Sequence, residues 1–254
     1  MHTAFFEPAG PDTFAATAST IGPWSTDAQH GGPPSALAAR VMEAFEPAPG
    51  QRLASVAVDI LRPVPVGKLT ARTRTVRPGR RVALVETVLS AAGQEVLHAR
   101  GWKIQLNAVP ATPAAVPPPV PAAGGPAGMT WEGYGTAIEW RYVSGRGLAE
   151  PGPSAAWMRP TIPLLPGEQM SAMSRALLCG DSGSGLSSVL DPRACLFINV
   201  NVNVMLQRDP QGEWLLVDAV TAVGPDGTGV ATSTLSDTTG AVGQVAQALL
   251  VAPR

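Results

Sequence analysis

The two halves of this 254-residue chain resemble each other, and this internal similarity constrains the fold more than any other feature of the sequence. The segment SVAVDILRPVPVGKL in the first half aligns with NVNVMLQRDPQGEWL in the second, which places Arg62 opposite Arg208. HGGPPSALAARVM aligns with AMSRALLCGDSGSGL, which places Ala39 opposite Asp181. A repeat of this length predicts one unit of a helix and antiparallel strands that was duplicated and fused. Two unrelated strand-rich domains remain the alternative.

The first half is expected to hold one helix followed by strands. Pro33 and Pro34 suit the first turn of a helix, where their missing N–H groups would be unpaired anyway, and an apolar stripe continues to Phe45. From residue 55 to residue 106, alternating and β-branched residues predict strands. Gly93 lies in the last predicted hairpin, opposite Gly240 of the second half.

The second half repeats this order. Residues 172–190 carry an apolar stripe at helical spacing, with Asp181 in the middle of the run. In the strand that follows, asparagines alternate with valines, so Val200, Val202 and Val204 are expected on one face. Alternation predicts further strands over residues 213–223, 228–237 and 241–251.

Residues 107–128 are rich in proline, alanine and glycine, a composition typical of a linker with polyproline character. The predicted organisation is therefore an N-terminal repeat over residues 1–106, a linker over 107–128 and a C-terminal repeat over 129–254. The C-terminal repeat holds the acidic helix, so we expect the catalytic residues there.

Composition excludes several classes of function. Hydrophobic residues make up 45% of the chain and charged residues 15%, which is typical of a globular protein. The net charge of −1 gives no electrostatic reason to expect nucleic acid as a partner. Cys179 and Cys195 form no disulfide framework and no metal-ligand spacing, so no metal is predicted. Without a signal peptide or an apolar run of membrane-spanning length, a cytoplasmic protein with no membrane span is expected.

A helix that follows an HGG turn and precedes about four long antiparallel strands resembles the hotdog fold. A tandem pair of such units resembles the acyl-CoA thioesterase II family and its thioesterase-like relatives. Three segments carry this resemblance: QHGGPPSALAARV, ALLCGDSGSGLSSVLDP and DTTGAVGQVAQALLV. The resemblance implies an α+β protein with a double hotdog fold that hydrolyses acyl-CoA to a free carboxylic acid and CoA, without a cofactor.

The resemblance also implies a catalytic set in the second repeat. In that family an aspartate, a threonine or serine, and a glutamine orient the water that attacks the thioester. By position Asp181 matches the aspartate and Gln247 the glutamine, whereas Asn199 stands where the family has a hydroxyl. Asn199 can hold a water by donating and accepting hydrogen bonds. It cannot become a covalent nucleophile, so direct attack by water is expected.

The HGG turn supplies candidate substrate-binding residues. His30, Gly31 and Gly32 precede a helix, where free backbone N–H groups can polarise a carbonyl. A tight turn that simply requires glycine is the structural alternative. Because Ala39 stands opposite Asp181, we expect one active site per chain, with the first repeat supplying binding surface.

Parts of the sequence also suggest other functions. CGDSGSG resembles the segment around the nucleophile of chymotrypsin-like proteases, but no histidine stands in the sequence context that such an enzyme needs. A hotdog enoyl-CoA hydratase is disfavoured because no histidine lies within ten residues of Asp181. A non-catalytic acyl-CoA-binding protein remains an alternative, supported by Asn199.

The arginines between Arg72 and Arg81 could form a solvated strand face or meet the phosphates of CoA. Exposed sheet edges predict a homo-oligomer, a dimer or higher.

Overall fold

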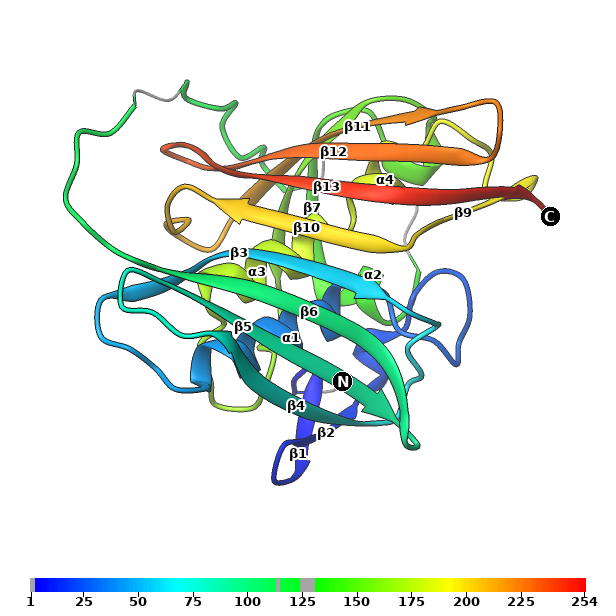
Figure 1. Ribbon diagram of the computed structural model, residues 1–254. Coiled ribbons are helices and arrows are strands. Elements are labelled where there is room, and N and C mark those ends of the chain that lie inside the picture. Colours follow the sequence, from blue (N-terminus) through cyan, green and yellow to red (C-terminus); the bar gives the residue numbers. More distant parts are fainter. Residues whose placement is uncertain (1–2, 113–114, 124–130) are drawn as a thin grey trace.

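One antiparallel sheet dominates the molecule (Figure 1). The computed structural model describes residues 3–112, 115–123 and 131–254. The strands of the first half are β1 (Phe6–Gly10), β2 (Thr13–Ala16), β3 (Gln51–Ile60), β4 (Lys68–Arg77), β5 (Val82–Ala91) and β6 (Gln94–Gln105). Those of the second half are β7 (Ile138–Ser144), β8 (Ser154–Pro160), β9 (Cys195–Asn199), β10 (Asn201–Leu206), β11 (Leu215–Val223), β12 (Thr228–Asp237) and β13 (Gly240–Pro253).

The order of the strands is the same in both halves when it is followed outward from the centre. The sheet runs β1-β2-β4-β5-β6-β3-β10-β13-β12-β11-β8-β7, and β9 pairs with β13 beside this path. The first long strand of each half, β3 or β10, lies at the centre, where the two pair antiparallel (Figure 1). The predicted strands of residues 55–106 and 213–251 are confirmed.

The strand registers inside each half fix which residues correspond. Val58 pairs with Ala99, five residues after the hairpin closes at Gln94, and Val204 pairs with Val245, five residues after it closes at Gly240, so Val58 occupies in β3 the position that Val204 occupies in β10. This is the correspondence that the sequence alignment predicts, with Arg62 and Arg208 in equivalent places.

One predicted correspondence is wrong by a residue. Ala91 pairs with Gln94 at the end of the first hairpin, and Asp237 pairs with Gly240 at the end of the second. Gly240 therefore corresponds to Gln94 and not to Gly93. The register of a hairpin is set by the pair that closes its turn, which glycine content alone does not locate.

Two long helices pack against each other and on one face of the sheet (Figure 1). They are α1 (Gly32–Ala44), which confirms the helix predicted after the HGG turn, and α3 (Ala172–Gly180). The helices approach closely at Gly32, because a Cβ atom there would lie only 2.5 Å from the backbone oxygen of Leu178. Shorter helical segments are η1 (Ala18–Thr20), α2 (Tyr134–Ala137), η2 (Gly147–Ala149) and α4 (Gly183–Leu186).

The predicted helix over residues 172–190 is two helices, and this corrects the expected position of Asp181. Helix α3 ends at Gly180 and α4 begins at Gly183. Asp181 therefore caps α3 at a break and does not lie within a continuous helix. A side chain at such a break can leave the helix surface and enter a neighbouring cavity.

The predicted strand over residues 199–205 is also interrupted, at Val200, between β9 and β10. Val202 and Val204 are fully buried as expected, but Val200 is 45% exposed, so the prediction for that valine is wrong. The backbone N–H of Ala248 donates to the Asn201 side-chain oxygen at 2.8 Å across the gap. The break acts as a β-bulge, which shifts the side-chain alternation by one residue.

The predicted linker holds neither helix nor strand over residues 107–112, and the described residues 115–123 hold none either. Residues 113–114 and 124–128 of that prediction lie outside the described residues. Trp157 and Arg141 donate to the backbone oxygens of Pro118 and Pro121, so this segment lies along the second half of the chain. None of the described helices is long and apolar enough to cross a membrane.

Candidate functional site

Asp181 lines a cavity to which both halves contribute residues, and the residue is almost completely buried, with 3% exposed. The Asn199 amide nitrogen donates to Asp181 Oδ1 at 2.7 Å. The Gln247 amide nitrogen donates to the backbone oxygen of Asp181 at 3.0 Å and reaches Oδ1 at 3.4 Å. The structure therefore brings together the three side chains that the sequence predicted as a catalytic set.

Hydrogen bonds near the two breaks in secondary structure hold the side chains of Asn199 and Gln247. Asn199 is the last residue of β9, directly before the break at Val200, and its amide nitrogen also donates to the backbone oxygen of Asn201 at 3.2 Å. Gln247 is buried on β13, and its side-chain oxygen accepts from the Ser184 N–H at 3.0 Å. Both amides are thus fixed with a donor pointing at Asp181.

His30 reaches the same carboxylate from the other half of the chain. Its Nδ1 atom lies 3.1 Å from Asp181 Oδ2 and 3.1 Å from the backbone nitrogen of Gly32. When Nδ1 carries a proton it donates to the carboxylate, and when it does not it accepts from the Gly32 N–H. The imidazole stacks on the Tyr134 ring, with the ring centroids 3.9 Å apart.

His30 thus contacts Asp181, although no histidine lies near this aspartate along the chain. The sequence predicted His30 only as part of a substrate-binding turn. The packing of α1 against α3 brings the two side chains into contact across 151 positions of sequence. No local signal in the sequence marks this pair.

Burial governs the protonation of the pair. Burial raises the pKa of the Asp181 carboxyl above its ordinary value, against the opposing effect of its polar neighbours. Those neighbours, which favour the ionised form, are His30, Asn199, the Gly32 N–H and Gln247. Burial also lowers the pKa of the His30 imidazole, so the neutral ring is favoured beside the carboxyl group. Such a carboxylate is a stronger base than an exposed aspartate.

The two glycines of the HGG turn have different roles. Gly31 lines the cavity, and a Cβ atom on it would lie 2.8 Å from Asp181 Oδ2 and 3.0 Å from Oδ1. Gly32 does not line the cavity, and its N–H donates to His30. Gly31 thus keeps space for the carboxylate, whereas Gly32 permits the close contact between the helices.

We expect Gly31→Ala to lower kcat by about 10- to 100-fold, because the added methyl group displaces a carboxylate that must be accurately placed. A matched control is Gly67→Ala, since nothing lies within 4 Å of the Cβ position there. Steady-state kinetics, with circular dichroism to verify folding, measure the effect. Wild-type kcat in Gly31→Ala would contradict this role.

The first half has no equivalent polar set. Ala39 aligns with Asp181, and the strand register places Leu53 at the position of Asn199 and Gly101 at that of Gln247. A Cβ atom on Gly101 would lie 2.6 Å from Leu53 Cδ1 and 2.8 Å from Met42 Sδ. Apolar side chains therefore fill the space that corresponds to the polar cluster.

The cavity has a volume of about 700 Å³ and receives residues from both halves. Its walls are mainly apolar, and five aromatic side chains line it: Trp24, Trp131, Trp140, Tyr142 and Phe197. The charged side chains among its described lining residues, apart from His30, are Asp27, Arg62 and Asp181. A cavity of this size is typical of a small-molecule or cofactor site.

The arginine cluster between Arg72 and Arg81 lies elsewhere. Arg74 pairs with Glu86 and Arg72 with Glu95 on the sheet, and none of the cluster lines the cavity. Within the described ranges, no group of three or more histidine, cysteine or acidic side chains is placed to hold a metal ion.

Comparison with known proteins gives matches over most of the chain. Residues 20–104 match the family model described as the acyl-CoA thioesterase N-terminal domain, and residues 112–251 match the model of the acyl-CoA thioesterase C-terminal domain. No curated protein is similar enough in sequence to count as a match.

Solved structures match over nearly the whole length. A Thermobifida fusca protein named as a candidate thioesterase II has a TM-score of 0.78 at 17% identity, covering 98% of this chain and 96% of that one. A hotdog-fold protein of unknown function from Alicyclobacillus acidocaldarius has a TM-score of 0.77 at 17% identity, covering 96% and 95%. An acyl-CoA thioesterase II from Mycobacterium marinum has a TM-score of 0.69 at 15% identity, covering 98% and 95%. These similarities establish the hotdog fold.

Proposed function

Because the chain belongs to the acyl-CoA thioesterase family and is thus a thioester hydrolase, we propose that it hydrolyses acyl-CoA with a water molecule activated by Asp181. The observation that carries this mechanism is the buried carboxylate of Asp181 in the wall of the cavity, bound by the amides of Asn199 and Gln247. We also propose that the two halves are fused hotdog repeats, over residues 1–106 and 129–254, with one active site between them.

In the proposed reaction, Asp181 accepts a proton from water as the water oxygen attacks the thioester carbonyl carbon. Asn199 lines the cavity, and its side-chain oxygen can accept a hydrogen bond from that water while its nitrogen holds the carboxylate. The C–S bond of the tetrahedral intermediate then breaks, and the proton passes from Asp181 to the departing thiolate. The products are a carboxylic acid and free CoA.

The negative charge that develops on the carbonyl oxygen needs a donor. Gly31 lines the cavity directly before the first turn of α1, where backbone N–H groups point away from the helix. We therefore assign oxyanion stabilisation to the Gly31 N–H. His30 positions Asp181, and its neutral ring adds no opposing charge to the developing oxyanion.

Release of free thiol from a panel of acyl-CoA esters tests the proposed function. The panel runs from short to long straight chains and includes aromatic acyl groups, since mainly apolar walls can accept any of these acyl classes. Hydrolysis of at least one member well above the rate without protein is expected. Failure to release thiol from any member would contradict the proposal.

We expect the ionisation of Asp181 to set the acid limb of the pH profile of kcat/KM. Since burial raises the pKa of this carboxyl, kcat/KM should fall with decreasing pH at a higher pH than an ordinary aspartate would give. Asn199→Ala removes a donor at 2.7 Å that stabilises the ionised form, so it should move this limb to still higher pH. Profiles of kcat/KM for both proteins measure the shift, and a limb that moves to lower pH in the variant would contradict the assignment.

One observation favours a second candidate. An aspartate and a histidine in one site is the pair that the resemblance assigns to hotdog enoyl-CoA hydratases, and His30 contacts Asp181 here. A hydratase would add water across the double bond of crotonyl-CoA and release no thiol. Loss of enoyl absorbance without thiol release would select the hydratase, and thiol release from saturated acyl-CoA would select the thioesterase.

A further inference from the structure

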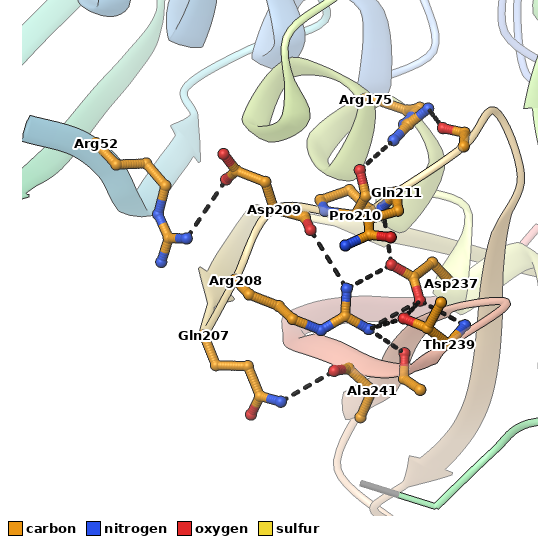
Figure 2. Close-up of polar contacts among 12 residues, drawn as sticks. Arg52, Arg175, Gln207, Arg208, Asp209, Pro210, Gln211, Asp237, Thr239 and Ala241 are labelled. Carbon is orange, nitrogen blue, oxygen red and sulfur yellow. Dashed lines mark hydrogen bonds and ion pairs between the residues drawn. The ribbon is translucent and has the colours of Figure 1, made fainter. Parts of the chain in front are cut away.

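The arginine that follows the central strand has different surroundings in the two halves. Arg208, after β10, donates to both carboxylate oxygens of Asp237, and also to Thr239 Oγ1 at 3.0 Å and the Gly240 oxygen at 2.9 Å (Figure 2). Asp237 is fully buried and accepts a further bond from the Gln211 N–H at 2.7 Å. This arginine is held in place by the hairpin of its own half.

Arg62 is the equivalent arginine of the first half, and it lacks that carboxylate. The strand register places Ala91 at the position of Asp237. Arg62 instead donates to the neutral side-chain oxygen of Gln94, and it forms no ion pair with any residue that the structure describes. Its side chain is exposed. Both halves therefore have an arginine at this position, but it is paired with a buried carboxylate only in the second half.

Arg62 is also the one lysine or arginine among the described residues that line the active-site cavity. It lies two residues beyond Ile60, whose Cδ1 atom is within 3.1 Å of the Cβ position of Gly31, beside the carboxylate of Asp181. Ile60, Arg62 and Asp181 all line this cavity, so Arg62 brings an exposed cation to the cavity that holds the proposed base.

We propose that Arg62 binds a phosphate group of the thiol carrier, and so selects thioesters of CoA over uncharged thioesters; this rests on the proposed function. The long pantetheine arm of CoA separates the thioester from the phosphates, so a phosphate-binding group must lie away from Asp181. A guanidinium presents paired donors that match phosphate oxygens. The competing bond to Gln94 is to a neutral acceptor and is weaker than a bond to a phosphate.

The test compares thioesters of one acyl group on three carriers: CoA, 4′-phosphopantetheine and pantetheine. Arg62→Met should raise KM and lower kcat/KM for acyl-CoA by about 10- to 100-fold, with little change for acyl-pantetheine. Arg62→Lys should recover part of the loss, since it keeps the charge but not the paired donors. Arg72→Met, an exposed arginine outside the cavity, is the matched control and should leave all three substrates unchanged.

The phosphopantetheine ester identifies which phosphate is bound. A loss on both phosphorylated carriers assigns Arg62 to the phosphate nearest the pantetheine arm, and a loss on CoA alone assigns it to the nucleotide phosphates. An equal loss on acyl-pantetheine, or no loss on acyl-CoA, would overturn the proposal while leaving the hydrolase function intact. Should the wild type hydrolyse none of the esters, the proposed function fails, and the Kd for free CoA in wild type and Arg62→Met still tests the phosphate contact.

Discussion

Replacing Asp181 with asparagine is expected to lower kcat for thioester hydrolysis by about 100-fold or more, since a general base of this kind contributes roughly 10²–10⁴ to a rate. The substitution keeps the shape of the side chain and an oxygen that can accept from Asn199. It removes only the ability to take a proton from water. Thiol release at saturating acyl-CoA measures the loss.

Stability separates this catalytic role from a structural one. Burial disfavours the ionised Asp181, so its pKa is raised and the charge is a cost to the folded state. Asp181→Asn should therefore leave the unfolding temperature unchanged or raise it while activity is lost. Asp191→Asn, at an exposed ion pair with Arg193 in the same segment, is the matched control and should change neither property. Wild-type kcat in Asp181→Asn would exclude Asp181 as the base.

Asp237→Asn should cause the largest loss of stability, with the free energy of unfolding lower by about 3 kcal/mol, because hydrogen bonds to a buried charged group are worth about 1.5–3 kcal/mol and the amide sets an NH₂ group against donors that the carboxylate accepts. Asp237 is fully buried and accepts from Arg208, Gln211 and Thr239 (Figure 2). Urea denaturation measures the change. Asp218→Asn, at an exposed position on β11, should cost less than about 0.5 kcal/mol.

The same carboxylate predicts a dependence on pH. Although burial opposes ionisation, the hydrogen bonds from Arg208 and the backbone hold the pKa of Asp237 well below its usual range. A group whose pKa is lower in the folded protein contributes stability above the unfolded value of about 3.9, and this is lost as the pH falls below it. The wild type should therefore lose its advantage over Asp237→Asn between about pH 5 and pH 2. A difference that stays constant over this range would contradict the assignment.

Much of the fold follows from the sequence alone. The alternation of β-branched residues and the prolines before Leu37 are local signals, and they predicted the strands and helix α1. The repeated segments predicted that the two halves correspond, and the equivalent pairings of Val58 with Ala99 and of Val204 with Val245 agree with this correspondence. The hydrophobic periodicity of a helix or strand shows which of its faces is buried, so the element can be predicted from its own residues.

The arrangement of the candidate site depends on features that local sequence patterns do not predict. The sequence selected Asp181, Asn199 and Gln247 through a family resemblance, and the fold places these side chains within hydrogen-bonding distance. The break before Ser182 and the bulge at Val200, beside which Asp181 and Asn199 line the cavity, were not predicted. Gly180, Gly183 and Gly185 weaken a helix but do not fix where it ends. The alternation of residues 199–204 gives no sign of a bulge, so packing against neighbouring elements decides both interruptions.

Only the tertiary structure decided the role of His30 and the difference between the two arginines. His30 meets Asp181 because helices α1 and α3 pack closely at Gly32, a contact between residues far apart in sequence. Arg62 and Arg208 occupy equivalent positions in the alignment. They differ in their partners, because Asp237 at the end of β12 pairs with Arg208, whereas Ala91 stands at the equivalent position of β5. Local sequence sets the periodicity of each element, but the distance between charged groups, and hence their pKa and chemistry, is set by how the elements pack.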